Sequence, residues 1–243
     1  MALRLCLCTL IMLLTSAYPV LAEPLVIGVA KGFPPYQFEQ NGAPGGFDVD
    51  VAKAVAEELD MDIRFHQDAW DNVVGMLRLG EIDCAAGMEI NPFRDRLFIF
   101  TTPYTTRHNA VFVLENSPIN GVEDLYGQII TGDRHSFVEL YWREQGIFNK
   151  IRVSQTATKA QAMKQLADGH SAAAIMPLQV GRHLARENDL KVRVVLHPDP
   201  GSDVGFAFTP RHDDLRLRFD HALDTLRRNG KLRALEQAWF EED

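Results

Sequence analysis

Short apolar runs alternate with segments of helical periodicity along most of this chain. Runs rich in branched residues, such as 24–30 (PLVIGVA), predict buried strands. In 47–60 (FDVDVAKAVAEELD), apolar residues recur close to helical spacing, and Asp48 is placed to cap the start of the predicted helix. Further strands are expected at 61–67, 81–88, 109–115, 122–133, 171–177 and 204–210. Further helices are expected at 70–80, 136–146, 158–169, 178–188 and 214–240, the last split at Gly230.

This alternation is typical of α/β domains with a largely parallel sheet. It forms one unit over about the first hundred residues and a second unit over about 107–203, followed by the terminal helices. The segment 31–46 (KGFPPYQFEQNGAPGG) contains three prolines and four glycines and is expected to be a loop. Small ligands of open α/β sheets lie beyond the carboxyl ends of the strands. The loops in that position are 31–36, 87–94, 131–137 and 176–179.

The first 22 residues have the pattern of an export signal that is removed from the mature protein. One positive charge at Arg4 precedes an apolar run, and Val20 and Ala22 stand where a signal peptidase reads small residues. No later stretch approaches the ~18 to 20 apolar residues of a membrane-spanning helix. The mature protein is therefore expected to be soluble and to lie outside the cytoplasm.

The cysteines point to a core-stabilised protein without an internal disulfide. Cys6 and Cys8 leave with the signal, and Cys84 alone cannot form one. Its apolar surroundings (IDCAAGM) predict a small buried hydrophobe rather than a reactive thiol.

Charge and motifs exclude several classes of function. Removing Arg4 lowers Lys plus Arg from 25 to 24 against 33 Asp and Glu, so the formal net charge moves from −8 to −9. A basic face, the usual footprint of nucleic-acid binding, is therefore not expected. The eight histidines lack the spacing of a metal site, and neither a phosphate-binding glycine loop nor a Gly-x-Ser-x-Gly elbow is present. No metal ion and no other cofactor is expected.

Six segments carry a resemblance to a known family. They are IGVAKGFPPYQF, GGFDVDVAKAVAEEL, LRLGEIDCAAGM, NPFRDRLFIFTTPY, LADGHSAAAI and LRRNGKLRALEQAWF. In order and spacing they resemble the extracytoplasmic solute-binding proteins of family 3, the polar amino acid transport type, over nearly the whole mature chain. The resemblance implies a two-lobed α/β fold of the periplasmic-binding-protein-like II type, each lobe a mainly parallel sheet flanked by helices, with two crossing strands joining them. Lobe one would comprise 23–106 and 204–243, and lobe two 107–203.

The activity that this resemblance implies is capture of a small carboxylate-bearing ligand, an amino acid or a related compound, in the cleft between the lobes. The expected location is the periplasm, and the expected partner is an ABC permease of the inner membrane. A monomer is expected.

The resemblance also assigns roles to individual residues. Arg94 matches the arginine that clamps the ligand carboxylate, a role suited to a guanidinium because its rigid fork of donors fits a carboxylate. The structural alternative is a surface arginine paired with Asp95. Ser136 matches the position where a hydroxyl and helix-start N–H groups hold the same carboxylate, and a plain helix cap is its alternative. His135 precedes it and would add positive potential.

Two aromatic residues and a glycine complete the expected ligand site. Phe33 and Trp70 stand where the family places rings over the ligand side chain, with core packing as the competing account. Gly87 opens the loop that carries Arg94.

Two positions depart from the family pattern. Pro177 occupies the place of the aspartate that pairs with the ligand ammonium, and Glu89 occupies the place of a serine or threonine nearby. Because an unpaired buried carboxylate is costly, an unpaired Glu89 would have a raised pKa or would require a cation. Either Glu89 has taken over the ammonium of an amine-bearing ligand, or it pairs with Arg94 or a neighbouring base and the ligand lacks an amine.

Two other functions are compatible with the sequence. Cyclohexadienyl dehydratase resembles the same fold, and Glu89 would be its general acid if burial raised its pKa. A sensory or accessory module would bind the same ligand and report it to a membrane partner.

Overall fold

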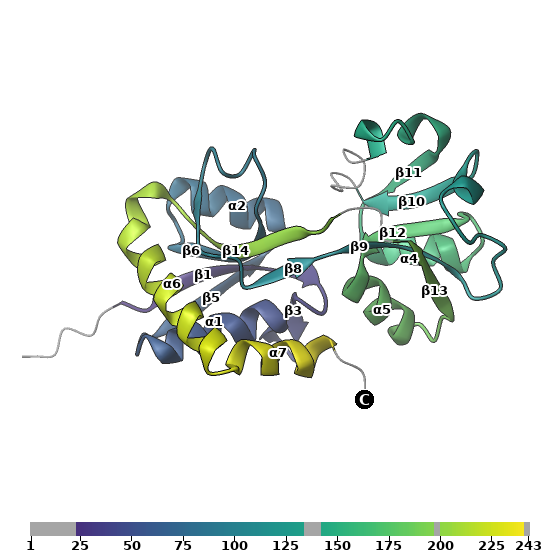
Figure 1. Ribbon diagram of the computed structural model, residues 1–243. Helices are drawn as coiled ribbons and strands as arrows, with labels where there is room; N and C mark the ends of the chain where they lie inside the picture. The colour runs from purple at the N-terminus through teal and green to yellow at the C-terminus, as the bar shows by residue number, and fades with distance from the viewer. Residues whose placement is uncertain (1–22, 134–141, 197–199, 241–243) are drawn as a thin grey trace, which may run out of the picture.

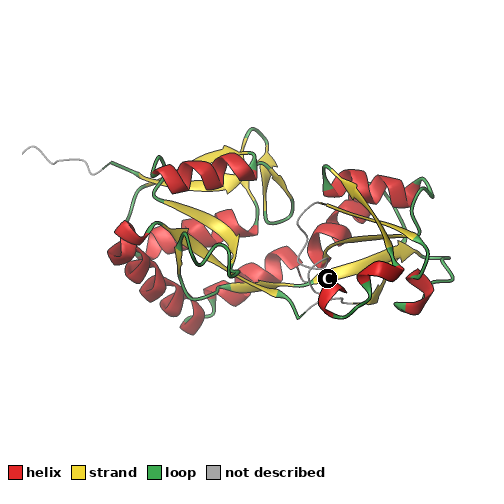
Figure 2. Ribbon diagram, turned by 90° about the horizontal axis from the view of Figure 1, so that it is seen from above, coloured by secondary structure: helices red, strands yellow, loops and turns green. Residues whose placement is uncertain are grey.

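The chain forms two lobes, as Figure 1 and the view from above in Figure 2 show. The computed structural model describes residues 23–133, 142–196 and 200–240. The expected export signal therefore lies outside the described residues. No helix in the described part of the chain has the length and apolar character needed to cross a membrane.

The first lobe is built on a mixed sheet in which strands β5-β1-β6-β14-β7 lie side by side and β8 pairs with β14. Strands β1, β5 and β6 are parallel, whereas β14 runs antiparallel to β6, β7 and β8. The strands are β1 (Leu25–Ala30), β5 (Ile63–Asp68), β6 (Cys84–Glu89), β7 (Ile99–Phe100), β8 (Thr105–Arg107) and β14 (Ser202–Phe208). Its helices are α1 (Phe47–Glu58), α2 (Trp70–Leu79), α6 (Asp213–Arg228) and α7 (Lys231–Phe240).

Helices cover both faces of this sheet, which explains why its central strands β1 and β6 are mainly apolar. Figure 1 shows α2 on one side and α1, α6 and α7 on the other. Ala85 and Met88 of β6 pack in the cluster that contains α2, while Cys84 and Ala86 pack in the cluster that contains α1. Cys84 is fully buried, as the sequence predicted.

The second lobe has a sheet of strand order β11-β10-β12-β9-β13. Strands β10, β11 and β12 are parallel, and β9 is antiparallel to both β12 and β13. The strands are β9 (Asn109–Leu114), β10 (Ile129–Asp133), β11 (Arg152–Thr156), β12 (Ala173–Pro177) and β13 (Val192–Leu196). Helices α4 (Lys159–Ala167) and α5 (Leu178–Glu187) pack on it, and one-turn 3-10 helices occupy Glu123–Leu125, Phe148–Lys150 and, in the first lobe, Pro210–His212.

Four local expectations were wrong or incomplete. Of the strand expected at 122–133, only β10 (Ile129–Asp133) is a strand, and Glu123–Leu125 is a 3-10 helix. The segment 31–46 is not simply a loop, because its backbone pairs in a small antiparallel sheet of β2 (Gly32–Phe33), β3 (Gln37–Gln40) and β4 (Ala43–Gly45). The polar edge strand β11 and the half-buried β13 were not assigned from sequence. The helix α1 begins after Gly46 without a side-chain cap, because Asp48 turns into the core instead.

The two connections between the lobes run through β8 to β9 and from β13 to β14 (Figure 1). Strand β8 pairs with the start of β14, so the two connections are hydrogen-bonded to each other at the first lobe. Arg107 is the last residue of β8 and is buried. A cationic side chain therefore lies inside the protein next to the point where the chain crosses between lobes.

Candidate functional site

The turn that follows β6 brings Arg94 back to the end of that strand. The side-chain oxygen of Asn91 accepts hydrogen bonds from the backbone N–H groups of Phe93 and Arg94. The Arg94 guanidinium Nη1 then donates to the backbone carbonyl of Glu89 at 2.8 Å. Within the described residues, Arg94 makes no ion pair with Asp95 or with another carboxylate.

Arg94 is half-buried, and burial lowers the pKa of its guanidinium, while the nearby charge of Glu89 acts in the opposite direction. An arginine keeps its positive charge at neutral pH even so. Its guanidinium carbon lies 5.8 Å from the centroid of the Trp70 ring, at the start of α2. The structure thus brings Arg94, Glu89 and Trp70 together, with the cation held by a neutral carbonyl.

Position 87 of β6 requires a glycine. Its φ of 69° is in the left-handed region, and a Cβ atom there would lie 1.9 Å from Gln37 Nε2 and 2.2 Å from Asp48 Oδ2. Those two side chains are hydrogen-bonded to each other at 2.6 Å. Gly87 therefore allows a buried polar network to approach the backbone beside Glu89.

The centre of that network is an ion pair between Asp48 and Arg107. Arg107 Nη2 lies 2.5 Å from Asp48 Oδ2, and the side chains are 4% and 0% exposed. Tyr104 donates its hydroxyl hydrogen to the other Asp48 oxygen at 2.9 Å. Burial opposes the charge of Arg107, but the neighbouring acidic groups, with Asp48 foremost, outweigh it and raise the pKa of Arg107.

Arg107 also connects the network to the predicted site. Its Nη1 donates to the carbonyl of Gly87 at 3.0 Å and lies 4.0 Å from Glu89 Oε1. Its guanidinium carbon lies 5.0 Å from the ring centroid of Phe33 and 4.2 Å from that of Tyr36. The side-chain carboxylate of Glu89 therefore lies at ion-pair distance from Arg107. Arg94 instead donates to the backbone carbonyl of Glu89.

Sequence reasoning missed Arg107. One signal was present: Arg107 stands in a largely apolar and threonine-rich region, TTPYTTRHNAVFVLE. If that region is buried, the arginine requires a buried acidic partner.

The start of α4 brings a residue of the second lobe next to the same site. Thr158 caps this helix by accepting the N–H of Gln161 at 3.1 Å. The next residue, Lys159, places its Nζ 4.9 Å from the centroid of the Phe33 ring of the first lobe. Phe33, half-buried, thus has a cation from each lobe beside it. Ser136 and His135, expected at this face of the second lobe, lie outside the described residues.

Pro177 ends β12 and is buried. It precedes α5, whose first N–H, that of Leu178, donates to the carbonyl of His108 at 2.9 Å. A proline there supplies no carboxylate at the end of β12.

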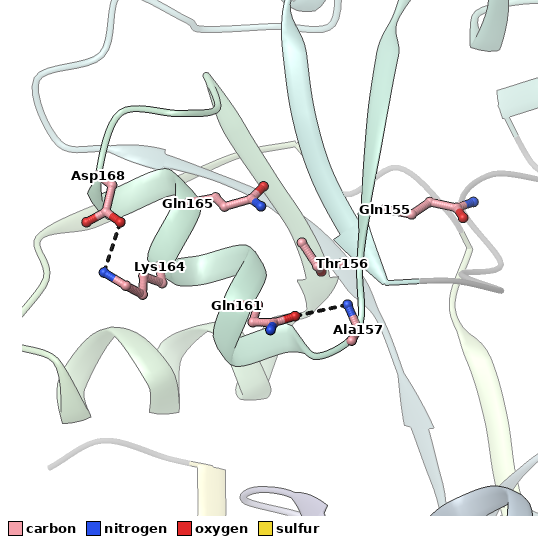
Figure 3. Close-up of a pocket in the computed structure, with 7 residues that line it drawn as sticks. All are labelled: Gln155, Thr156, Ala157, Gln161, Lys164, Gln165 and Asp168. Carbon is pink, nitrogen blue, oxygen red and sulfur yellow. Dashed lines mark hydrogen bonds and ion pairs between the residues drawn. The ribbon is translucent and has the colours of Figure 1, made fainter.

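A separate groove of about 320 Å³ lies on the second lobe beside α4 (Figure 3). Three of its polar side chains are engaged locally: Gln161 accepts the N–H of Ala157 at 3.1 Å, and Lys164 pairs with Asp168 at 2.9 Å. None of the residues expected from the sequence lines this groove. The groove is therefore distinct from the site around Arg94.

The Arg94 site presents a cation and a carboxylate next to each other. Arg94 offers N–H donors beside an aromatic ring, and Glu89 offers a carboxylate that is 33% exposed. Within the described residues no cluster of His, Cys, Asp and Glu could hold a metal ion.

Comparisons with known proteins identify the family and the fold. The family model for bacterial extracellular solute-binding proteins, family 3, matches residues 25–242. The ABC transporter arginine-binding protein 1 of Escherichia coli K12 is 26% identical over 227 residues, covering 90% of this chain and 91% of that protein.

Two solved structures are similar in fold. A histidine kinase sensor domain with similarity to periplasmic binding proteins is 30% identical, with a TM-score of 0.79 over 90% of this chain and 96% of that one. An ancestral amino acid-binding protein, a precursor of cyclohexadienyl dehydratase, is 25% identical, with a TM-score of 0.78 over 90% and 96%. With its two lobes and a family match over nearly the whole described chain, this protein belongs to the bacterial extracellular solute-binding proteins, family 3.

Proposed function

We propose that this protein captures a small carboxylate-bearing ligand, an amino acid or a close relative, between its two lobes and delivers it to an ABC permease. It acts as a monomer in the periplasm, after removal of residues 1–22. The ligand is released unchanged, and neither a metal ion nor another cofactor takes part.

The observation that carries this proposal is the state of Arg94. Its guanidinium is half-buried and is held by the carbonyl of Glu89, while no carboxylate of the described residues neutralises it. A partly desolvated cation with remaining donors favours an anionic partner, and a carboxylate fits its geometry. The same guanidinium lies over the Trp70 ring, 5.8 Å from its centroid.

Closure of the lobes follows from differential contacts. A ligand held by Arg94 and Trp70 of the first lobe gains further contacts only when the second lobe approaches, so it stabilises the closed state. The expected partner on the second lobe is Ser136.

The test is calorimetric titration with a panel of the common amino acids and the corresponding 2-oxo acids. Arg94→Ala should weaken binding of every carboxylate ligand by about 100-fold or more, because a charge-assisted bidentate pair is lost. Arg96→Ala is the matched control, since Arg96 is exposed in the same turn and its removal should leave affinity unchanged. Retained affinity in Arg94→Ala would overturn the assignment.

The same titrations decide the role of Glu89. We propose that its carboxylate takes the ligand ammonium in place of the aspartate that Pro177 replaces. Glu89→Gln should then weaken amino acids but not 2-oxo acids. An equal effect on both would mean that Glu89 serves Arg107 and that the ligand needs no amine.

A sensory role is the second candidate, favoured by the 30% identity to a histidine kinase sensor domain. Deletion of the gene separates the two: loss of ligand uptake supports transport, whereas intact uptake with altered gene expression supports sensing.

An enzymatic role is less well supported. Elimination chemistry proceeds best in a site that excludes water, and the Glu89 side chain is 33% exposed. Incubation with prephenate or arogenate should therefore give no product.

A further inference from the structure

We infer that Arg107 is a positioning residue of the ligand site: it holds the carboxylate of Glu89 away from Arg94 and so leaves Arg94 available to the carboxylate of the ligand. This inference rests on the function proposed above and goes beyond it by naming a residue that acts without touching the ligand. Arg107 therefore affects ligand affinity only while residue 89 carries a negative charge.

The side chain of Glu89 has an arginine on each side. Its Oε1 lies 4.0 Å from Arg107 Nη1, while Arg94 Nη1 donates to the backbone carbonyl of the same glutamate at 2.8 Å. Burial lowers the pKa of the Arg94 guanidinium, and the charge of Glu89 opposes that shift, so the two charges already interact. A rotation about the side-chain bonds of Glu89 would bring its carboxylate to Arg94. Such a pair would occupy the donors that a ligand carboxylate needs.

Contacts on several sides hold Arg107 in place. Its Nη2 pairs with Asp48 at 2.5 Å, and its Nη1 donates to the carbonyl of Gly87 at 3.0 Å. Its guanidinium carbon lies 4.2 Å from the centroid of the Tyr36 ring, and the side chain is 4% exposed. Water screens such a cation less than an exposed one. Arg107 is therefore a fixed positive charge that attracts the carboxylate of Glu89.

The pair with Asp48 does not account for the whole arrangement of Arg107. The guanidinium presents donors on two nitrogens, and only Nη2 is directed at Asp48. Nη1 lies toward Glu89, so one side chain serves two carboxylates. Within the part of the chain that the structure describes, this division leaves Arg94 without a carboxylate partner. The Glu89 side chain remains 33% exposed, so its position near Arg107 does not remove it from contact with a ligand.

Calorimetric titration of a cycle of variants tests the inference. The probe is the amino acid of the panel that binds the wild-type protein most tightly. Asp48→Asn and Arg107→Met are made together, because loss of Arg107 alone leaves Asp48 buried without its cation. This paired replacement is measured with Glu89 in place and again in combination with Glu89→Gln. Equilibrium dialysis extends the comparison to weak binding.

With Glu89 in place, the paired replacement should weaken binding by about tenfold or more, because Glu89 then pairs with Arg94 and competes with the ligand; a hydrogen bond to a charged group has about this effect on an equilibrium constant. In combination with Glu89→Gln, the paired replacement should change the affinity by less than about twofold, because a neutral amide competes little for Arg94. A purely structural role of Arg107 would weaken binding equally in both cases.

Glu57→Gln with Lys231→Met is the matched control. It also removes one ion pair that joins α1 to another element without changing the net charge, but at the exposed surface. It should leave the affinity unchanged. Circular dichroism checks that each variant is folded. If the first pair is not, Asp48→Asn with Arg107→Gln, whose amides can still hydrogen-bond, gives the same comparison.

Equal weakening with and without Glu89→Gln would overturn the inference, as would an unchanged affinity with Glu89 in place. If Arg94→Ala still abolishes binding in either case, the proposed function stands and only the role of Arg107 is wrong. Binding of no amino acid and no 2-oxo acid by the wild-type protein would overturn both.

Discussion

Replacing Arg107 with methionine would leave the carboxylate of Asp48 buried without its cation. The Asp48 side chain is fully buried, and the Arg107 guanidinium that neutralises it is 4% exposed. Gln37 and Tyr104 would still donate hydrogen bonds to the carboxylate, at 2.6 Å and 2.9 Å, but neither carries a charge. Methionine fills most of the volume of the arginine stem, so the variant tests the charge more than the packing.

The structure sets the expected magnitude. Removing one partner of a buried ion pair costs about 3–5 kcal/mol, because the remaining charge is desolvated without compensation. In a protein of this size about 1 kcal/mol shifts the midpoint of thermal unfolding by about 2–4 °C, so a fall of about 6–20 °C is expected.

Thermal unfolding followed by circular dichroism at pH 7 is the assay. Lys53→Met is the control, because Lys53 pairs with Asp50 on the same helix as Asp48 but at the exposed surface. Its loss should cost less than about 1 kcal/mol. The double variant Asp48→Asn, Arg107→Met removes both charges and should be more stable than Arg107→Met alone. An Arg107→Met midpoint no lower than that of the control, or a double variant less stable than the single one, would refute this account of the pair.

Two further predictions concern stability. Gly87→Ala should destabilise the protein by about 2–4 kcal/mol in urea unfolding, because of its positive φ and the close approach of Gln37, whereas Gly75→Ala, in open space on α2, should be neutral or stabilising. Burial raises the pKa of the Cys84 thiol and, separately, of the Tyr104 hydroxyl. The unfolded state therefore loses these protons first, and the free energy of unfolding should fall as pH rises above about 8.5 for Cys84 and about 10 for Tyr104. Cys84→Ala should remove the first part of that decline; an unchanged profile would contradict it.

Most of the fold could be predicted from local sequence patterns. The helix α2 ends where Gly80 adopts the left-handed conformation that the sequence predicted as a stop, and α6 and α7 separate at Gly230. Buried strands such as β6 were also apparent, because helices on both faces require an apolar run without alternation. These features depend on residues within one or two turns of each other, so the sequence can report them.

Edge strands and the direction in which strands pair were harder to predict from the sequence. Strand β11 has the polar sequence RVSQT and becomes a strand because β10 offers its free edge. The antiparallel placement of β14 and β9 in otherwise parallel sheets depends on where the chain crosses between lobes, and no local pattern encodes it.

The candidate site divides in the same way. The sequence by itself indicated that Arg94 lies in a turn after a buried strand and that Glu89 precedes it, and the family resemblance predicts an aspartate where Pro177 stands. Only the tertiary structure decided that Asp48 pairs with Arg107, 59 residues away, rather than capping its helix. It alone placed Lys159 against Phe33 across the lobes. The physical reason is that a buried charge or a cation beside a ring is stabilised by whichever group the folded chain brings within a few ångströms, and that distance has no signature in the spacing of residues along the sequence.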